Sequence, residues 1–192
     1  METVSPLLDV KNLTLITGGA RSGKSAFAES LANADGGPVL YVATMEEIAE
    51  DTEAVERIKR HRARRPQSWK TIEVPLAVHR AVSEIPEITS VCLVDCLSLY
   101  VSNMLLSLDE KSVALPELEA AIFTAAADLL ESMKSKPTTH FIVVTNEVGW
   151  GIVPQHKLAR TYRDLLGLVN QQFAACAGQV WLSCVGLQIK LK

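Results

Sequence analysis

The stretch LTLITGGARSGKS, residues 13–25, decides the fold of this 192-residue chain. Its first five residues are apolar or β-branched, which is typical of a buried strand, and the strand pattern stops at Gly18-Gly19. The last eight residues match the Gly-x-x-x-x-Gly-Lys-Ser pattern of a phosphate-binding loop. A helical pattern follows from Lys24 to about Asn33. Because the motif requires a strand before it and a helix after it, this context predicts that a nucleoside triphosphate binds here.

The chemistry of phosphate binding explains why these residue types occur in the loop. The glycines let backbone amides curl around the β-phosphate, Lys24 would reach the β- and γ-phosphate oxygens, and Ser25 would hold Mg²⁺. The predicted nucleotide contacts in the loop are Gly18, Gly19, Ala20, Arg21, Ser22, Gly23, Lys24 and Ser25. The alternative is a chance glycine-rich turn, which the flanking strand and helix patterns disfavour.

The rest of the chain alternates short apolar strands with helices. Further strands are expected at 39–44, 70–74, 91–95, 140–145, 180–185 and 187–191. Helices are expected at 50–64, from Pro75, at 117–134 and at 155–177 with Gly178 as the C-terminal cap; 97–106 is an apolar segment. This order predicts an α/β fold with a mainly parallel sheet covered on both faces and an antiparallel last strand. We expect a leader at 1–11 and one domain at 12–192.

Composition excludes several classes of protein. The chain is 48% hydrophobic and 21% charged, which is ordinary for a packed domain, and its net charge of −3 makes nucleic acid a poor default partner. Its four cysteines lie in apolar stretches without metal-ligand spacing, so neither a disulfide nor a zinc site is expected. No apolar run approaches the roughly 18–20 residues of a membrane span, and the N-terminus has no signal-peptide pattern. We therefore expect a cytoplasmic protein that has no membrane partner.

Two acidic residues end predicted buried strands. Asp95 follows VCLV and is the expected Mg²⁺ partner, with an N-cap of the next helix as the alternative interpretation. Glu147 follows the strand at 140–145 and is either a second acid near the substrate or a loop residue. Open α/β sheets bind ligands at the carboxyl edge of their strands, where both acids would lie.

The charged segment 50–66 contains a histidine among arginines. At helical spacing, His61 shares a stripe with Ala54 and Ile58 rather than with Lys59. Neighbouring arginines favour the neutral, nucleophilic imidazole and attract phosphates. A histidine in this setting could attack phosphorus and carry a covalent intermediate. From the pattern alone, a solvated basic helix with an incidental histidine is the simpler interpretation.

Several longer blocks resemble one enzyme family. They are GGARSGKS (18–25), YVATM (41–45), RIKRHRARRPQSWKTIE (57–73), VDCLSLYVSN (94–103), TNEVGWGIVP (145–154) and LARTYRDLLGLVNQQFAACAGQVWL (158–182). Together they resemble the bifunctional adenosylcobinamide kinase / adenosylcobinamide-phosphate guanylyltransferases of cobalamin biosynthesis. The resemblance runs from about residue 13 to the C-terminus.

This resemblance implies a RecA-like P-loop fold, a homotrimer and two activities. Adenosylcobinamide is phosphorylated with ATP or GTP, and GMP then passes from GTP to adenosylcobinamide phosphate through a guanylylated histidine, which falls on His61. The catalytic residues implied are His61 and Lys24. Besides the loop, GTP contacts are implied at Thr44, Met45, Glu46, Arg62, Ala63, Arg64, Arg65, Glu73 and Asp95.

Two rival functions remain open at this point. A simple small-molecule kinase would use the loop without forming covalent GMP, and His61 would then be structural. A nucleotide-gated switch would hydrolyse slowly and change its association with a partner. The full set of blocks favours the bifunctional enzyme.

Overall fold

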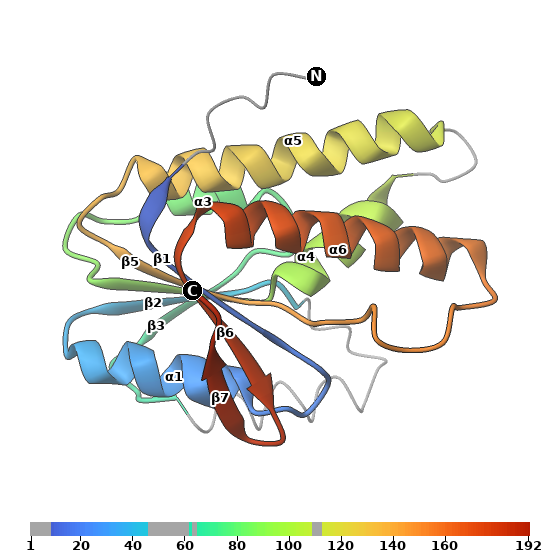
Figure 1. Ribbon diagram of the computed structural model, residues 1–192. Coiled ribbons are helices and arrows are strands. Elements are labelled where there is room, and N and C mark those ends of the chain that lie inside the picture. Colours follow the sequence, from blue (N-terminus) through green and yellow to red (C-terminus); the bar gives the residue numbers. More distant parts are fainter. Residues whose placement is uncertain (1–8, 46–61, 63–64, 109–112) are drawn as a thin grey trace.

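The chain forms one sheet whose strands are mostly parallel. The computed structural model describes residues 9–45, 62, 65–108 and 113–192, and within them the sheet has seven strands in the order β3-β2-β4-β5-β1-β6-β7 (Figure 1). The strands are β1 Val10–Gly18, β2 Val39–Ala43, β3 Lys70–Glu73, β4 Val91–Asp95, β5 His140–Val144, β6 Ala177–Cys184 and β7 Leu187–Lys190. The helices are α1 Lys24–Asp35, α3 Val78–Ser83, α4 Leu97–Ser107, α5 Leu115–Lys134 and α6 Lys157–Cys176.

The pairing gathers the carboxyl ends of six strands at one edge. β1 pairs in parallel with β5 and β6, β2 with β3 and β4, and β4 with β5. Only the last pair in the described sheet, β6 with β7, is antiparallel, as the sequence predicted. The phosphate-binding loop leaves the carboxyl end of β1, and Asp95 ends β4, so parallel pairing brings both to the same edge.

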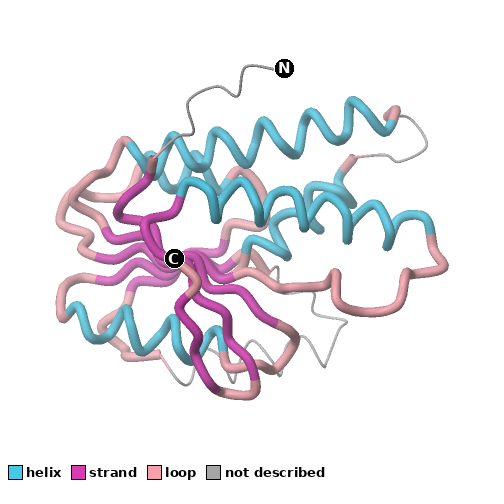
Figure 2. Tube along the Cα trace, in the orientation of Figure 1, coloured by secondary structure: helices cyan, strands magenta, loops and turns pink. Residues whose placement is uncertain are grey.

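Helices cover both faces, as expected. In Figures 1 and 2, α1 lies on one side of the sheet, and α3, α4, α5 and α6 lie on the other. The larger core packs on the four-helix side, where α5 contributes Leu118, Ile122, Leu129 and Met133. The smaller core, beneath α1, includes Ile16, Tyr41, Leu93 and Ile142. Buried strands with apolar residues on both faces are the expected consequence of this layering.

The ends of two helices follow known local rules. α5 has a proline in its first turn, Glu117 near its N-terminus and Lys134 near its C-terminus, which complement the helix dipole. α1 ends at Gly36, whose φ of 78° is the left-handed conformation that glycine adopts easily. None of the helices in the described part of the chain is long and apolar enough to cross a bilayer.

Three sequence predictions require correction. The helix expected from Pro75 begins at Val78, because Ala77 takes a left-handed conformation with φ 53°. Gly178 is not a helix cap: α6 ends at Cys176, and Gly178 lies inside β6, where an added Cβ would be 2.2 Å from the Lys11 carbonyl oxygen. Because glycine has no Cβ, β6 can lie close to β1 at this position. The strand expected from residue 13 already starts at Val10, so the last two residues of the 1–11 segment belong to the sheet.

Candidate nucleotide site

The phosphate-binding loop joins β1 to α1 through three residues with positive φ. Gly18 has φ 147°, Arg21 has φ 57° and Gly23 has φ 100°. Left-handed residues turn successive amides toward one concavity, which is how backbone nests bind anions. Gly23, the N-cap of α1, has no side chain with which to cap the helix, so the first amides of α1 are left to a ligand or to water.

Lys24 lies within this concavity rather than in solvent. It is only 7% exposed, and its Nζ donates a hydrogen bond of 2.6 Å to the carbonyl oxygen of Gly19. Ser22 is equally buried, and its Oγ has no hydrogen-bond partner within the described residues. A buried hydroxyl without a partner is uncommon in folded proteins and is satisfied by a bound ligand or water. The loop thus combines a buried cation with unused hydrogen-bonding capacity.

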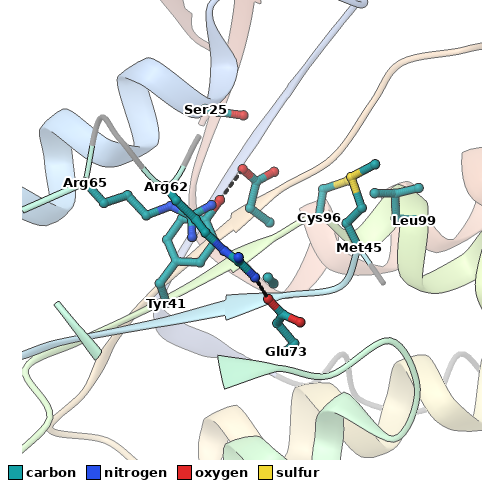
Figure 3. A pocket seen from close by; sticks show the side chains of 10 residues that line it. Ser25, Tyr41, Met45, Arg62, Arg65, Glu73, Cys96 and Leu99 are labelled. Carbon is teal, nitrogen blue, oxygen red and sulfur yellow. Dashed lines mark hydrogen bonds and ion pairs between the residues drawn. The ribbon is translucent and has the colours of Figure 1, made fainter. Parts of the chain in front are cut away.

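A pocket lies beside the loop, with a volume of about 540 Å³ counted out to its mouth. Its walls come from Ser25 at the end of the loop, from the carboxyl ends of β2, β3 and β4, from the start of α4, and from Arg62 and Arg65 (Figure 3). The lining residues are Ser25, Tyr41, Ala43, Met45, Arg62, Arg65, Glu73, Asp95, Cys96 and Leu99.

The pocket brings together six of the residues that the sequence singled out: Ser25, Met45, Arg62, Arg65, Glu73 and Asp95. Thr44 lies between two lining residues, but it is fully buried, and its hydroxyl bonds to the backbone of Cys96. The other loop candidates, residues 18–24, are not among those that line the pocket. The candidates Glu46, His61, Ala63 and Arg64, and most of the helix expected at 50–64, lie outside the described residues.

Two arginines in the pocket wall are held by neighbouring side chains. The guanidinium of Arg62 pairs with Glu73, and both side chains are about half exposed. Arg65 places its guanidinium carbon 3.3 Å from the centre of the Tyr41 ring, a cation–π contact. The Nε atom of Arg65 is buried and has no hydrogen-bond partner in the described part of the chain. Arginines held in this way are suited to bind phosphate oxygens.

Asp95 is held by a tyrosine that the sequence analysis missed. The hydroxyl of Tyr41 donates a hydrogen bond of 2.5 Å to Oδ2 of Asp95, and Tyr41 is only 1% exposed. Burial, and then the charge of Asp95, raise the pKa of Tyr41 above its ordinary value, so the phenol stays protonated. The N-cap alternative for Asp95 is wrong, because the N-cap of α4 is Cys96.

Cys96 follows Asp95 in the pocket wall, and its thiol is not a nucleophile at neutral pH. Burial, together with the charge of Asp95, raises its pKa to about 11. Its backbone is held at both polar atoms by Thr44, whose hydroxyl accepts from the Cys96 amide and donates to the Cys96 carbonyl, both at 2.8 Å. The side-chain amide of Asn103 in turn donates to the carbonyl oxygen of Thr44 at 2.8 Å. This network fixes the backbone from which Asp95 projects.

Glu147 is tied to the phosphate-binding loop through its backbone. Its amide donates a 2.9 Å hydrogen bond to the Gly18 carbonyl, while its carboxylate accepts one of 2.7 Å from the Gly149 amide. The residue is not among those that line the pocket. The Glu147 carboxylate therefore stabilises the loop that contains Glu147 and Gly149, and the Glu147 backbone amide helps to position Gly18.

The oxygen atoms around the loop suit a magnesium ion. Ser25 supplies a hydroxyl and Asp95 a carboxylate to the same pocket wall. Among the described residues, no group of three or more His, Cys, Asp or Glu side chains could form an all-protein metal cage. Mg²⁺ is usually bound by one or two carboxylates together with substrate phosphates and water, so the donor set fits this ion.

A phosphate-binding loop at the carboxyl edge of a mostly parallel sheet, beside a pocket of arginines and carboxylates, defines a P-loop nucleotide-binding protein. An ATPase from the type III secretion system of pathogenic bacteria shares this fold, with a TM-score of 0.57 and 10% sequence identity. The superposition covers 94% of this chain and 58% of the ATPase. At this identity the likeness concerns the fold alone, and it confirms the expected P-loop architecture.

Sequence comparison narrows this class to one family. The cobinamide kinase / cobinamide phosphate guanyltransferase family matches residues 14–191, and the chain belongs to this family of enzymes. It is 39% identical over 184 residues to the bifunctional adenosylcobalamin biosynthesis protein CobU of Escherichia coli (strain K12), covering 94% of this chain and 99% of the relative. It is 42% identical over 178 residues to CobP of Pseudomonas aeruginosa, covering 93% and 96% of the two chains.

Proposed function

We propose that this enzyme phosphorylates adenosylcobinamide with ATP or GTP and then transfers GMP from GTP to adenosylcobinamide phosphate. The product of the second reaction would be adenosyl-GDP-cobinamide. The observation that carries this proposal is the pocket, which joins Ser25 of the phosphate-binding loop to Asp95 and to two arginines. The residues of this pocket also lie within the part of the chain, residues 14–191, that matches the family, and the alignment covers 99% of the Escherichia coli relative.

In the kinase reaction, the loop amides and Lys24 would bind the β- and γ-phosphates of the nucleotide. The hydroxyl on the aminopropanol arm of cobinamide attacks the γ-phosphorus, the bond to the β,γ-bridging oxygen breaks, and the nucleoside diphosphate leaves. Ser25 and Asp95 would hold Mg²⁺, which supplies neutralisation of the phosphate charge when bound. Buried Lys24, which is already hydrogen-bonded to the loop, needs little reorganisation to perform this role.

In the guanylyl transfer, the neutral imidazole of His61 attacks the α-phosphorus of GTP and expels pyrophosphate. A phosphate oxygen of adenosylcobinamide phosphate then attacks the same phosphorus and releases the imidazole. His61 lies outside the described residues, but the next residue in the chain, Arg62, lines the pocket. Arg62 and Arg65 would neutralise the charge that builds up on the leaving pyrophosphate.

The remaining sequence candidates complete the proposed GTP site. Besides the loop, they are Thr44, Met45, Glu46, Arg62, Ala63, Arg64, Arg65, Glu73 and Asp95. Thr44 would act through the backbone of Cys96, to which its hydroxyl is bonded. We also propose a homotrimer, which the family resemblance implies, and a cytoplasmic location, which the sequence composition led us to expect.

Product analysis with two labels separates this function from its rivals. With γ-labelled nucleotide and adenosylcobinamide, label should appear in adenosylcobinamide phosphate. With α-labelled GTP and adenosylcobinamide phosphate, label should appear in a GDP-linked cobinamide together with free pyrophosphate. A simple kinase would give only the first product. A nucleotide-gated switch would give neither, and its hydrolysis rate would not respond to cobinamide. Either of these patterns would contradict the proposal.

A further inference from the structure

Tyr41 connects two parts of the pocket that are far apart in the sequence. Its phenol oxygen lies 2.5 Å from Oδ2 of Asp95, and its ring face receives the guanidinium of Arg65 at 3.3 Å. In Figure 3, one of the two dashed lines marks the hydrogen bond from Tyr41 to Asp95, and the side chain of Arg65 reaches the Tyr41 ring. One buried side chain thus touches the proposed metal-binding acid and one of the proposed phosphate-binding arginines.

The register of the sheet explains why these residues meet. Ala43 of β2 is the partner of Asp95 in β4, and Tyr41 precedes Ala43 by two residues. Residues two apart in a strand share a face, and in-register partners in a parallel pair do so as well. Tyr41 and Asp95 are therefore diagonal neighbours on the face that α1 covers, within reach of a long aromatic side chain.

We propose that Tyr41 is a positioning residue for the nucleotide site. Its hydroxyl fixes the orientation of the Asp95 carboxylate toward the metal, and its ring fixes Arg65 toward the phosphates. This inference rests on the proposed function, because it takes Asp95 as the acid that holds Mg²⁺. A carboxylate on a short side chain has two rotatable bonds, and a hydrogen bond from a rigid, buried donor removes much of that freedom. Tyr41 itself would not touch the reacting atoms.

The ring and the hydroxyl of Tyr41 have separable effects. Tyr41→Phe keeps the ring beneath Arg65 and removes only the donor to Asp95. Tyr41→Leu removes both, so it should also weaken binding that does not depend on the metal. Tyr162→Phe is a matched control, because its hydroxyl also donates a hydrogen bond, 3.2 Å to the Ser98 carbonyl, and Tyr162 does not line the pocket.

The test measures affinity for a non-hydrolysable GTP analogue by isothermal titration, once with Mg²⁺ and once with EDTA. The ratio of the two affinities is the metal-dependent part of binding. Wild-type protein, Tyr41→Phe, Tyr41→Leu, Asp95→Asn, the Tyr41→Phe/Asp95→Asn double variant and the Tyr162→Phe control are compared, and thermal unfolding of each shows that it is folded. If Tyr41 acts through Asp95, the two substitutions must not be additive.

We expect Tyr41→Phe to lower this ratio about tenfold, the scale of a hydrogen bond to a charged group, and to leave the EDTA affinity unchanged. In the Asp95→Asn background it should have no further effect. A wild-type ratio in Tyr41→Phe, with a lowered ratio in Asp95→Asn, would overturn the positioning role alone. An unchanged ratio in Asp95→Asn would overturn the metal-binding role of Asp95 in the proposed function, and the inference with it.

Discussion

The amide of Gly186, in the turn between β6 and β7, donates a 3.0 Å hydrogen bond to the carbonyl oxygen of Ser22 in the phosphate-binding loop. The C-terminal hairpin therefore braces the loop from outside the nucleotide pocket. A second close approach lies at Gly18, where an added Cβ would be 2.2 Å from the Ser183 carbonyl oxygen of β6. The loop depends on residues some 160 positions later in the chain for its shape.

Gly18→Ala should destabilise the protein through this contact. The new methyl group would clash with backbone, and the φ of 147° is unfavourable for alanine. Overpacking and backbone strain of this kind together cost about 2–4 kcal/mol. Urea unfolding measures the loss. Gly19→Ala is the control, because a Cβ there meets nothing within 4 Å, so its free energy of unfolding should stay close to wild type. Equal stability of the two variants would contradict the close approach of Gly18 to the Ser183 carbonyl.

Lys24→Ala should abolish most nucleotide binding while leaving the fold intact. The ammonium is buried in the loop and bonded to Gly19. Under the proposed function it also binds phosphate, so its loss would remove a charge-assisted hydrogen bond to the nucleotide. Hydrogen bonds to charged groups are worth about 1.5–3 kcal/mol, so the dissociation constant for GTP should rise roughly 10–150-fold. Isothermal titration measures it. Lys190→Ala, on the C-terminal strand, is the control, and a similar loss there would show that the effect is general.

Thr44→Val should weaken both stability and nucleotide binding, because it leaves the buried amide of Cys96 without its acceptor. An unpaired buried group costs about 1–3 kcal/mol. Thr139→Val makes the same change at another buried threonine, whose hydroxyl donates to the Thr89 carbonyl at 3.0 Å, away from the pocket. Both variants should unfold at lower urea concentration, but only Thr44→Val should bind GTP more weakly. Normal GTP affinity in Thr44→Val would contradict the positioning role of the Thr44–Cys96 network.

His140 should make stability depend on pH. Burial lowers the pKa of its imidazole below the ordinary value of 6.5, although Asp35 partly opposes this shift, and Nε2 lies 2.9 Å from the Thr14 hydroxyl. Because the folded state favours the neutral ring, the stability from this group is present above pH 6.5 and is lost as the pH falls. Between about pH 7.5 and about pH 5.5, wild type should lose more free energy of unfolding than His140→Asn.

Urea unfolding of wild type and His140→Asn at both pH values tests this prediction. The burial argument fails if wild type and His140→Asn lose equal stability over this range.

Local patterns predicted the elements that depend on local chemistry. The apolar runs at 91–95 and 140–145 contain the central strands β4 and β5, and the Gly-Lys-Ser loop lies between strand and helix as its motif requires. Errors arose where a distant contact decides the outcome. Gly178 resembles a helix cap in sequence, but its role is set by the approach of Lys11, which the local sequence cannot show.

For the candidate site, too, the sequence indicated some of the pocket residues and missed one. Asp95 could be selected as an acid at the end of a buried strand, and Arg62, Arg65 and Glu73 followed from the family blocks. Tyr41 was missed because its partner Asp95 is 54 residues away and the pairing depends on the register of β2 against β4. A tyrosine in an otherwise aliphatic buried strand was the available signal, since a buried phenol needs a hydrogen-bond partner.

Covalent labelling with α-labelled GTP tests the two-reaction account most directly. Wild-type protein, incubated without cobinamide, should acquire one GMP through a bond that is cleaved by acid and stable to base, as expected for phosphorus bonded to nitrogen, and peptide mapping should place it on His61. His61→Asn should acquire none, whereas His156→Asn should be labelled normally. Label on His61→Asn, or label mapped to another residue of the wild-type protein, would contradict guanylyl transfer through this histidine.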